Sequence, residues 1–164
     1  MTKNNTSKYD PDKLLPLFVQ AAKMRNQLNK AGLTDNAGAI HTCERIINII
    51  SHKLKYPNLS HPNNFKNSEY SRFSIKAKDA FDRNDKVYIE HVSPLRDFTK
   101  KAIEIAVKKE TSIEELKNFI LVNYELVLLT KDETIHLNRI NRSKMTPTRL
   151  ADAGINLATN KIIS

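Results

Sequence analysis

The chain has 164 residues, enough for one domain that buries roughly two thirds of its unfolded surface without disulfides. It has no apolar run of membrane-spanning length, and its polar N-terminus lacks the apolar stretch of a secretory signal, which predicts a cytoplasmic protein with no membrane partner. The 27 Lys and Arg against 18 Asp and Glu give a formal net charge of +9, which favours a polyanionic partner, nucleic acid first.

The first part of the chain has the pattern of a helical module. Residues 1–10 are polar and are expected to be disordered. Apolar residues at helical spacing predict helices over 14–31 and 36–55, which would pack as an αα-hairpin within 11–56. A loop rich in Pro, Asn and Ser follows over 57–71 and is the candidate boundary inside the chain.

Some residues with reactive side chains are expected to be structural. The single cysteine, Cys43, can form no internal disulfide and lies on the apolar face of the second predicted helix, which predicts a buried thiol. His41, His52 and His61 have no partners in the sequence pattern, so we interpret them as incidental.

The remaining part, 72–164, alternates helices with two short strands. The pattern predicts a helix or irregular segment over 72–83, strands over 86–90 and 125–129, helices over 94–109, 111–121 and 131–141, and a last short helix from Thr146 to Gly154. Capping-box sequences at 111–115 and 130–133 mark the starts of two of these helices. The expected fold is therefore α+β and mostly helical, in one compact domain.

A cluster of basic residues lies near the C-terminal end of the pattern. It carries no acidic residue and consists of Arg139, Arg142, Lys144 and Arg149. A second basic zone, with few acids, runs from Lys53 to Lys78. We predict that the first cluster binds nucleic acid, although a solvated surface would have the same composition.

The segment after the first strand is the most informative one. The strand ends in Glu90-His91 and stops at Pro94. A carboxylate beside an imidazole can hold a divalent cation while the imidazole takes a proton from water. On a basic chain, a phosphodiester is the substrate that fits this chemistry best.

Two motifs resemble those of the HNH nucleases, also called ββα-metal or His-Me finger nucleases. IEHVSPL, over 89–95, resembles the family element D/E-H-[IV]-x-P-L. NYELVLLTKDETIHLNR, over 123–139, resembles its element N-L-x-L-L-T-x-x-E-x-x-x-x-N. The resemblance covers about a third of the chain and implies a ββα-metal finger, here with a helical insertion between the two strands.

The resemblance also implies roles for individual residues. His91 matches the general base, and Glu90 and Asn138 match ligands of a divalent metal. Because both ligands offer oxygen atoms, Mg²⁺ or Mn²⁺ suits them better than zinc. Arg139 and Arg142 would bind the phosphates.

Other positions depart from the family pattern. The middle position, usually an Asn that fixes the histidine loop, aligns with Glu125, and Asn123 lies two residues earlier. The usual first ligand on the helix aligns with Thr134, and His136 lies two residues away on a different face. Asn123, Glu125 and His136 are therefore interpreted as supporting residues.

Two functions of different classes follow from these observations. The first is a metal-dependent endonuclease acting on double-stranded DNA, in a restriction, phage or defence setting, where a homodimer would suit palindromic cleavage. The second is a basic nucleic-acid-binding protein without catalysis, or a degenerate nuclease fold, which the net charge and helix content fit equally well.

Overall fold

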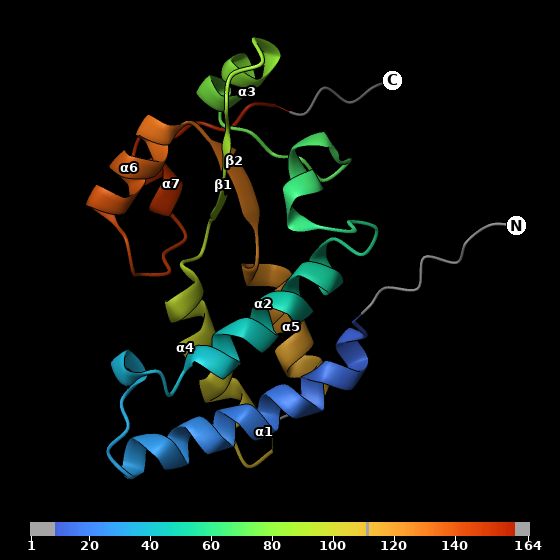
Figure 1. Cartoon of the computed structure of the whole chain (residues 1–164), viewed down its shortest axis with the longest axis vertical. Coiled ribbons are helices and arrows are strands. Elements are labelled where there is room, and N and C mark those ends of the chain that lie inside the picture. Colours follow the sequence, from blue (N-terminus) through green and yellow to red (C-terminus); the bar gives the residue numbers. More distant parts are fainter. Residues whose placement is uncertain (1–8, 111, 160–164) are drawn as a thin grey trace, which may run out of the picture. The chain divides into compact units, whose positions relative to one another are not determined.

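A computed structural model of the protein describes residues 9–110 and 112–159. Disorder is expected over 1–10; residues 1–8 lie outside the described residues, whereas Asp10 is ordered, because its side chain caps the first helix by accepting from the Asp12 N–H. Within them 59% are helical and one two-stranded antiparallel sheet is present, so the α+β, mostly helical class is confirmed. The elements in chain order (Figure 1) are α1 (Pro11–Lys30), η1 (Asp35–Ala37), α2 (His41–Lys55), η2 (Pro62–Asn67), α3 (Ile75–Asp82), β1 (Tyr88–His91), α4 (Leu95–Ala106), α5 (Ile113–Asn123), β2 (Leu126–Leu129), α6 (Lys131–Ile140) and α7 (Arg149–Asp152).

Two short 3₁₀ helices differ from the expected pattern. The second long helix does not begin near residue 36, because the chain first makes η1 and then turns at Gly38, whose φ of 108° suits a residue without a Cβ. The segment 57–71 is not a plain loop. It contains η2, where Pro62 sits in the first turn and the His61 ring accepts a hydrogen bond from the Asn63 backbone N–H at 3.2 Å.

The described residues divide into two compact units. The first comprises the residues up to Ser60 together with Thr99–Asn123, and the second comprises His61–Phe98 and the residues from Tyr124 onward. This division differs from the contiguous ranges expected from the sequence, because the segment between β1 and β2 clusters largely with the N-terminal helices.

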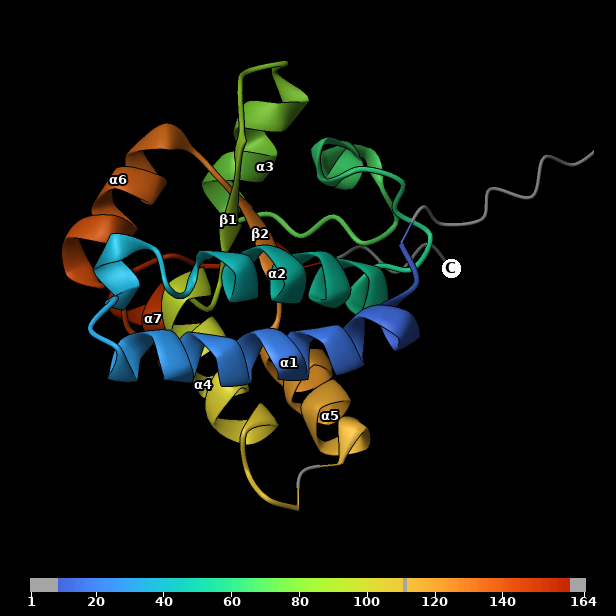
Figure 2. The same ribbon diagram turned by 60° about the horizontal axis from the view of Figure 1, so that its bottom comes forward.

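The first unit is a helical cluster. α1 and α2 lie side by side in both views (Figures 1 and 2), and α2 also contacts α5. Its buried side chains include Leu15, Phe18, Ile40, Cys43, Ile47, Ile50, Leu116 and Ile120. A partly buried ion pair between Arg25 and Asp35 ties α1 to η1, with the Arg25 Nε atom 2.8 Å from Asp35 Oδ1. The expected αα-hairpin is thus part of the first unit.

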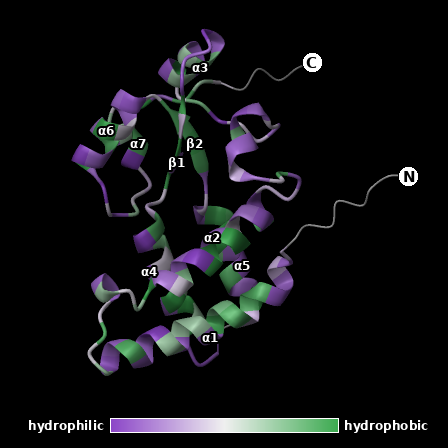
Figure 3. Cartoon of the chain, in the orientation of Figure 1, coloured by the Kyte–Doolittle hydropathy of each residue, from purple (hydrophilic) through white to green (hydrophobic). Residues whose placement is uncertain are grey.

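The second unit is built around β2. β1 pairs with it antiparallel, with Glu90 opposite Val127 and His91 opposite Leu126. The segment before α3 adds a parallel bridge on the other edge, between Phe73 and Leu128. Because β2 has neighbours on both edges, all four of its residues are buried, and it is coloured as hydrophobic in Figure 3. Val127 and Leu129 of β2 form a hydrophobic core with Leu137, Ala153 and Ile155.

A capping box fixes the start of α6, the helix that follows β2. Thr130 and Glu133 form the capping box that the sequence predicts, with each side chain bonded to the other residue's backbone N–H. From this start α6 contacts β1 and α7. Within the described ranges, no helix is both long and apolar enough to cross a membrane.

Candidate functional site

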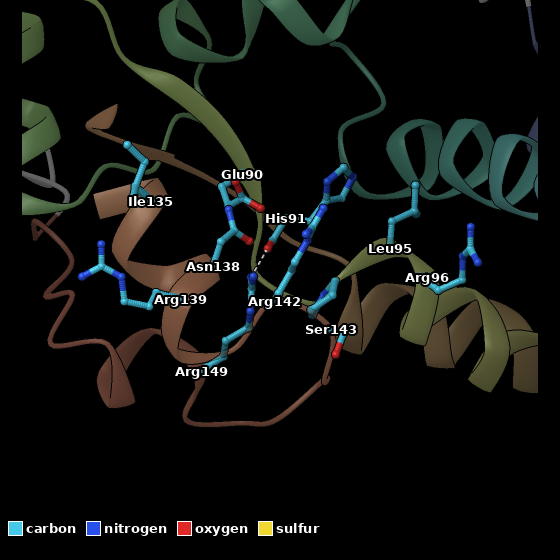
Figure 4. Close-up of a pocket in the computed structure, with 11 residues that line it drawn as sticks. Glu90, His91, Leu95, Arg96, Ile135, Asn138, Arg139, Arg142, Ser143 and Arg149 are labelled. Atoms are coloured by element: carbon cyan, nitrogen blue, oxygen red, sulfur yellow. Dashed lines mark hydrogen bonds between the residues drawn. The ribbon is translucent and has the colours of Figure 1, made fainter. Parts of the chain in front are cut away.

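A cavity of about 770 Å³ lies at the carboxyl end of β1 in the second unit (Figure 4). Its walls come from the end of β1, the first turn of α4, the exposed face of α6 and the loop that leads to α7. The lining residues are Glu90, His91, Pro94, Leu95, Arg96, Ile135, Asn138, Arg139, Arg142, Ser143 and Arg149. The structure therefore brings Glu90, His91 and Asn138 together in one cavity.

His91 is the last residue of β1, where the ladder to β2 ends. Its ring packs edge-on against Tyr124, with the ring centroids 5.6 Å apart. Burial, with a smaller contribution from the Arg149 charge, lowers the pKa of His91 to about 4. The imidazole is consequently neutral at physiological pH, the form that can accept a proton.

Glu90 and Asn138 offer oxygen atoms to the same cavity. Neither side chain makes a hydrogen bond or ion pair with any residue that the structure describes, and in Figure 4 they point toward one another. Burial raises the pKa of the Glu90 carboxyl, and the Arg149 charge offsets part of that rise. A partly buried carboxylate without a hydrogen-bonding partner is a good acceptor for a cation or a donor from a ligand.

The donor set fits a hard divalent cation. A carboxylate and an amide oxygen are ligands that Mg²⁺ and Mn²⁺ accept, with water and phosphate completing the shell. No group of three or more His, Cys, Asp or Glu that could hold an ion is found among the described residues, so a closed protein cage is absent there. The residues thus suit an ion that shares most of its coordination with a substrate.

Arginines make the cavity positive. Arg96, Arg139, Arg142 and Arg149 line it, against the single carboxylate of Glu90. Arg139 and Arg142 are exposed and make no hydrogen bond or ion pair within the described part of the chain. Guanidinium groups in this state can bind phosphate oxygens in a bidentate way. Lys144, from the same basic cluster, is exposed but does not line the cavity.

Arg149 differs from its expected role. It is 1% exposed, and its guanidinium donates hydrogen bonds to the backbone oxygens of His91 and Asn141 at 2.7 and 2.9 Å. The prediction that it binds nucleic acid as a surface residue is therefore corrected, since the side chain is buried and its Nε and Nη1 atoms donate to backbone carbonyls. Spacing along the chain could not reveal this, because His91 lies 58 residues away.

Three predicted supporting residues have other partners. The Asn123 amide donates to the Phe119 carbonyl one turn earlier in α5, at 2.8 Å. Glu125 forms an ion pair with Arg72. His136 is exposed and lines a separate cavity of about 470 Å³ on the other face of α6. None of these side chains lines the His91 cavity.

Two polar residues of the lining were not singled out from the sequence. Arg96 stands in the first turn of α4, two residues after Pro94, and Ser143 lies in the loop after α6. The only signal for Arg96 was its closeness to the Glu90-His91 pair along the chain. Ser143 lies inside the basic cluster but carries no charge, so charge patterning missed it.

The geometry combines in one cavity a neutral imidazole, two oxygen donors that make no hydrogen bond with the described residues, and two exposed arginines. These are the groups that proton transfer and phosphate binding require. No protein-family model, no curated protein and no solved structure matches this chain.

Proposed function

We propose that the protein is a metal-dependent endonuclease that hydrolyses phosphodiester bonds in nucleic acid, with double-stranded DNA as the expected substrate. One observation carries the proposal: the neutral His91 imidazole shares a cavity with two oxygen donors and with Arg139 and Arg142, which make no hydrogen bond or ion pair within the described residues. A net charge of +9 supports a polyanionic substrate.

In this proposal β1, β2 and α6 form a ββα-metal finger, the arrangement implied by the resemblance to HNH nucleases. The order strand, strand, helix and the antiparallel pairing of β1 with β2 support it. α4 and α5 would then be an insertion between the two strands. Cleavage of both strands at a palindromic site would further require two copies of the chain.

His91 would act as the general base. Its neutral ring takes a proton from a water molecule as the water oxygen attacks phosphorus, the bond from phosphorus to the 3′-oxygen breaks, and the leaving oxygen takes a proton from solvent. An anionic phosphate in the cavity stabilises the imidazolium, so it raises the basicity of the ring above its value in the empty site.

Glu90 and Asn138 would hold the divalent ion. A bound Mg²⁺ or Mn²⁺ would supply a positive charge that stabilises the negative charge developing on the phosphate oxygens. Arg139 and Arg142 orient the phosphodiester by binding its non-bridging oxygens.

The test is a nicking assay on supercoiled plasmid with Mg²⁺, with Mn²⁺ and with chelator. We expect the wild type to nick only with metal, and His91→Ala to lower the rate by about a hundredfold or more. His41→Ala, which removes an exposed histidine of the first unit, is the matched control and should cut like wild type. Single-stranded DNA and RNA substrates in parallel identify the substrate class.

A second candidate is a nucleic-acid-binding protein without catalysis. Glu125, which stands where the family pattern has an Asn, pairs with Arg72 and does not line the cavity, and this favours the second candidate. If the wild type shifts plasmid in a gel yet nicks it with neither metal, this candidate replaces the nuclease. If His91→Ala cuts as fast as wild type, the nuclease stands and the assignment of its base fails.

A further inference from the structure

We propose that Arg149 is the positioning residue of this site, holding the backbone of His91 at a fixed separation from the helix that carries Asn138. The inference rests on the proposed nuclease function. Arg149 lies in a basic cluster that indicates a nucleic-acid contact. Its burial and its hydrogen bonds indicate a positioning role instead.

The guanidinium links two segments that are distant in sequence. Its Nη1 atom donates to the carbonyl oxygens of His91 at 2.7 Å and Val92 at 3.3 Å, and Figure 4 marks the first of these bonds. Its Nε atom donates to the Asn141 carbonyl at 2.9 Å. One rigid planar group therefore joins the end of β1 to the end of α6.

Both tethered points adjoin the reacting groups. His91 carries the proposed base, and Asn141 lies three residues, about one helical turn, after Asn138. If the two segments moved apart, the imidazole and the amide oxygen would lose their common geometry. A misplacement of about 1 Å between reacting groups can slow a reaction by about a hundredfold.

The chemistry of the side chain suits this task. Arginine presents several N–H donors in a fixed plane, whereas lysine offers one flexible ammonium that can satisfy only one of the two segments well. The group is 1% exposed, and no carboxylate forms an ion pair with it among the described residues. Burying a cation is costly, and the carbonyl bonds together with the charge of Glu90 offset that cost.

Asn123 and Glu125, which the sequence predicts as supporting residues, do not join these two segments. The Asn123 amide bonds to its own helix, and Glu125 pairs with Arg72. The loop after α6 has further supports: the Asn141 side chain bonds Lys144 in both directions, at 2.8 and 2.9 Å, and Asp97 accepts from the Met145 N–H at 2.8 Å. These contacts order the loop after α6, and none of them involves the His91 backbone. Arg149 does bond to it.

The experiment compares Arg149→Lys and Arg149→Met with two controls in the full-length protein. Phe65→Leu trims a buried side chain in the same unit and controls for lost stability. Arg139→Met removes an exposed arginine from the same cavity and controls for lost phosphate binding. Single-turnover cleavage rates and DNA dissociation constants are measured at a temperature where each variant is folded.

We expect both Arg149 variants to cut about a hundredfold more slowly than wild type while their dissociation constants stay within about threefold. Arg139→Met, which removes a proposed phosphate contact, should weaken DNA binding where the Arg149 variants do not. Phe65→Leu should change neither quantity. An Arg149→Lys protein that cuts at the rate of Phe65→Leu overturns the inference, whereas a wild type that never cuts overturns the proposed function instead.

A readout that needs neither metal nor DNA completes the test. The Val92 N–H donates to the Glu125 carbonyl at 2.9 Å beside the tethered carbonyls. In metal-free protein, amide exchange at Val92 should be at least about tenfold faster in Arg149→Lys than in Phe65→Leu. The carbonyl ¹³C resonances of His91 and Asn141 should shift in the same variant. Unchanged exchange and unchanged resonances would show that Arg149 does not hold this backbone.

Discussion

Replacing Glu133 by alanine removes a carboxylate that joins the first turns of two helices. Its Oε2 atom accepts hydrogen bonds from the Ser74 hydroxyl at 2.6 Å and from the Thr130 N–H at 2.9 Å. Ser74 in turn accepts from the Ala77 N–H at the start of α3. Glu133 is 8% exposed, so solvent cannot replace these bonds fully.

The expected loss follows from that geometry. Each hydrogen bond to a charged acceptor contributes about 1.5 to 3 kcal/mol, so Glu133→Ala should lower the free energy of unfolding by about 3 to 5 kcal/mol. Glu133→Gln keeps an oxygen acceptor and should cost about 1 to 2 kcal/mol. Asp132→Ala, at an exposed neighbouring position in the same turn, should stay within about 0.5 kcal/mol.

Urea unfolding followed by circular dichroism at pH 7 measures all three variants against wild type. If Glu133→Ala and Asp132→Ala lose equal stability, the carboxylate does not join α3 to α6 in solution. If Glu133→Gln loses as much as Glu133→Ala, the charge matters more than the two acceptor contacts.

Two further predictions use the pKa values. The pKa of His91 is lowered to about 4 in the folded protein, so between about pH 6.5 and pH 4 the unfolded protein binds a proton at this histidine and the folded protein does not. The free energy of unfolding should therefore fall by about 2 kcal/mol between pH 7 and pH 5. Urea titrations at both pH values should show this fall in wild type, and His91→Gln should lack it. Burial raises the pKa of the Cys43 thiol to about 11 from 9.0, so at pH 8 a thiol reagent should modify folded protein at least about a hundredfold more slowly than protein in urea. A fast reaction of folded protein would contradict the burial of Cys43.

Local features of the structure could be predicted from the sequence. The capping box at Thr130 and Glu133, the apolar strand over 126–129 and the buried Cys43 each depend on neighbouring residues and on periodicity. The convergence of Glu90, His91 and Asn138 was predicted through the two motifs, whose spacing encodes a strand end facing a helix.

Long-range features could not be predicted in this way. The burial of Arg149 depends on a contact 58 residues along the chain, and a charge inside a basic cluster gives no sign of it. The parallel bridge from Phe73 to β2 depends on a segment that has no strand pattern of its own. The turn at Gly38 was missed because helical periodicity continues through it.

The chain leaves the second unit after Phe98 and returns to it at Tyr124, whose ring lies 5.8 Å from that of Phe98 between centroids. Exit and re-entry are therefore neighbours, and a linker of a few residues has the reach to join them. A redesigned chain running from His61 to Phe98, through such a linker, and on from Tyr124 would contain every residue that lines the cavity. It would turn a discontinuous unit into a small contiguous protein, suited to following the site by NMR without the signals of the N-terminal helices.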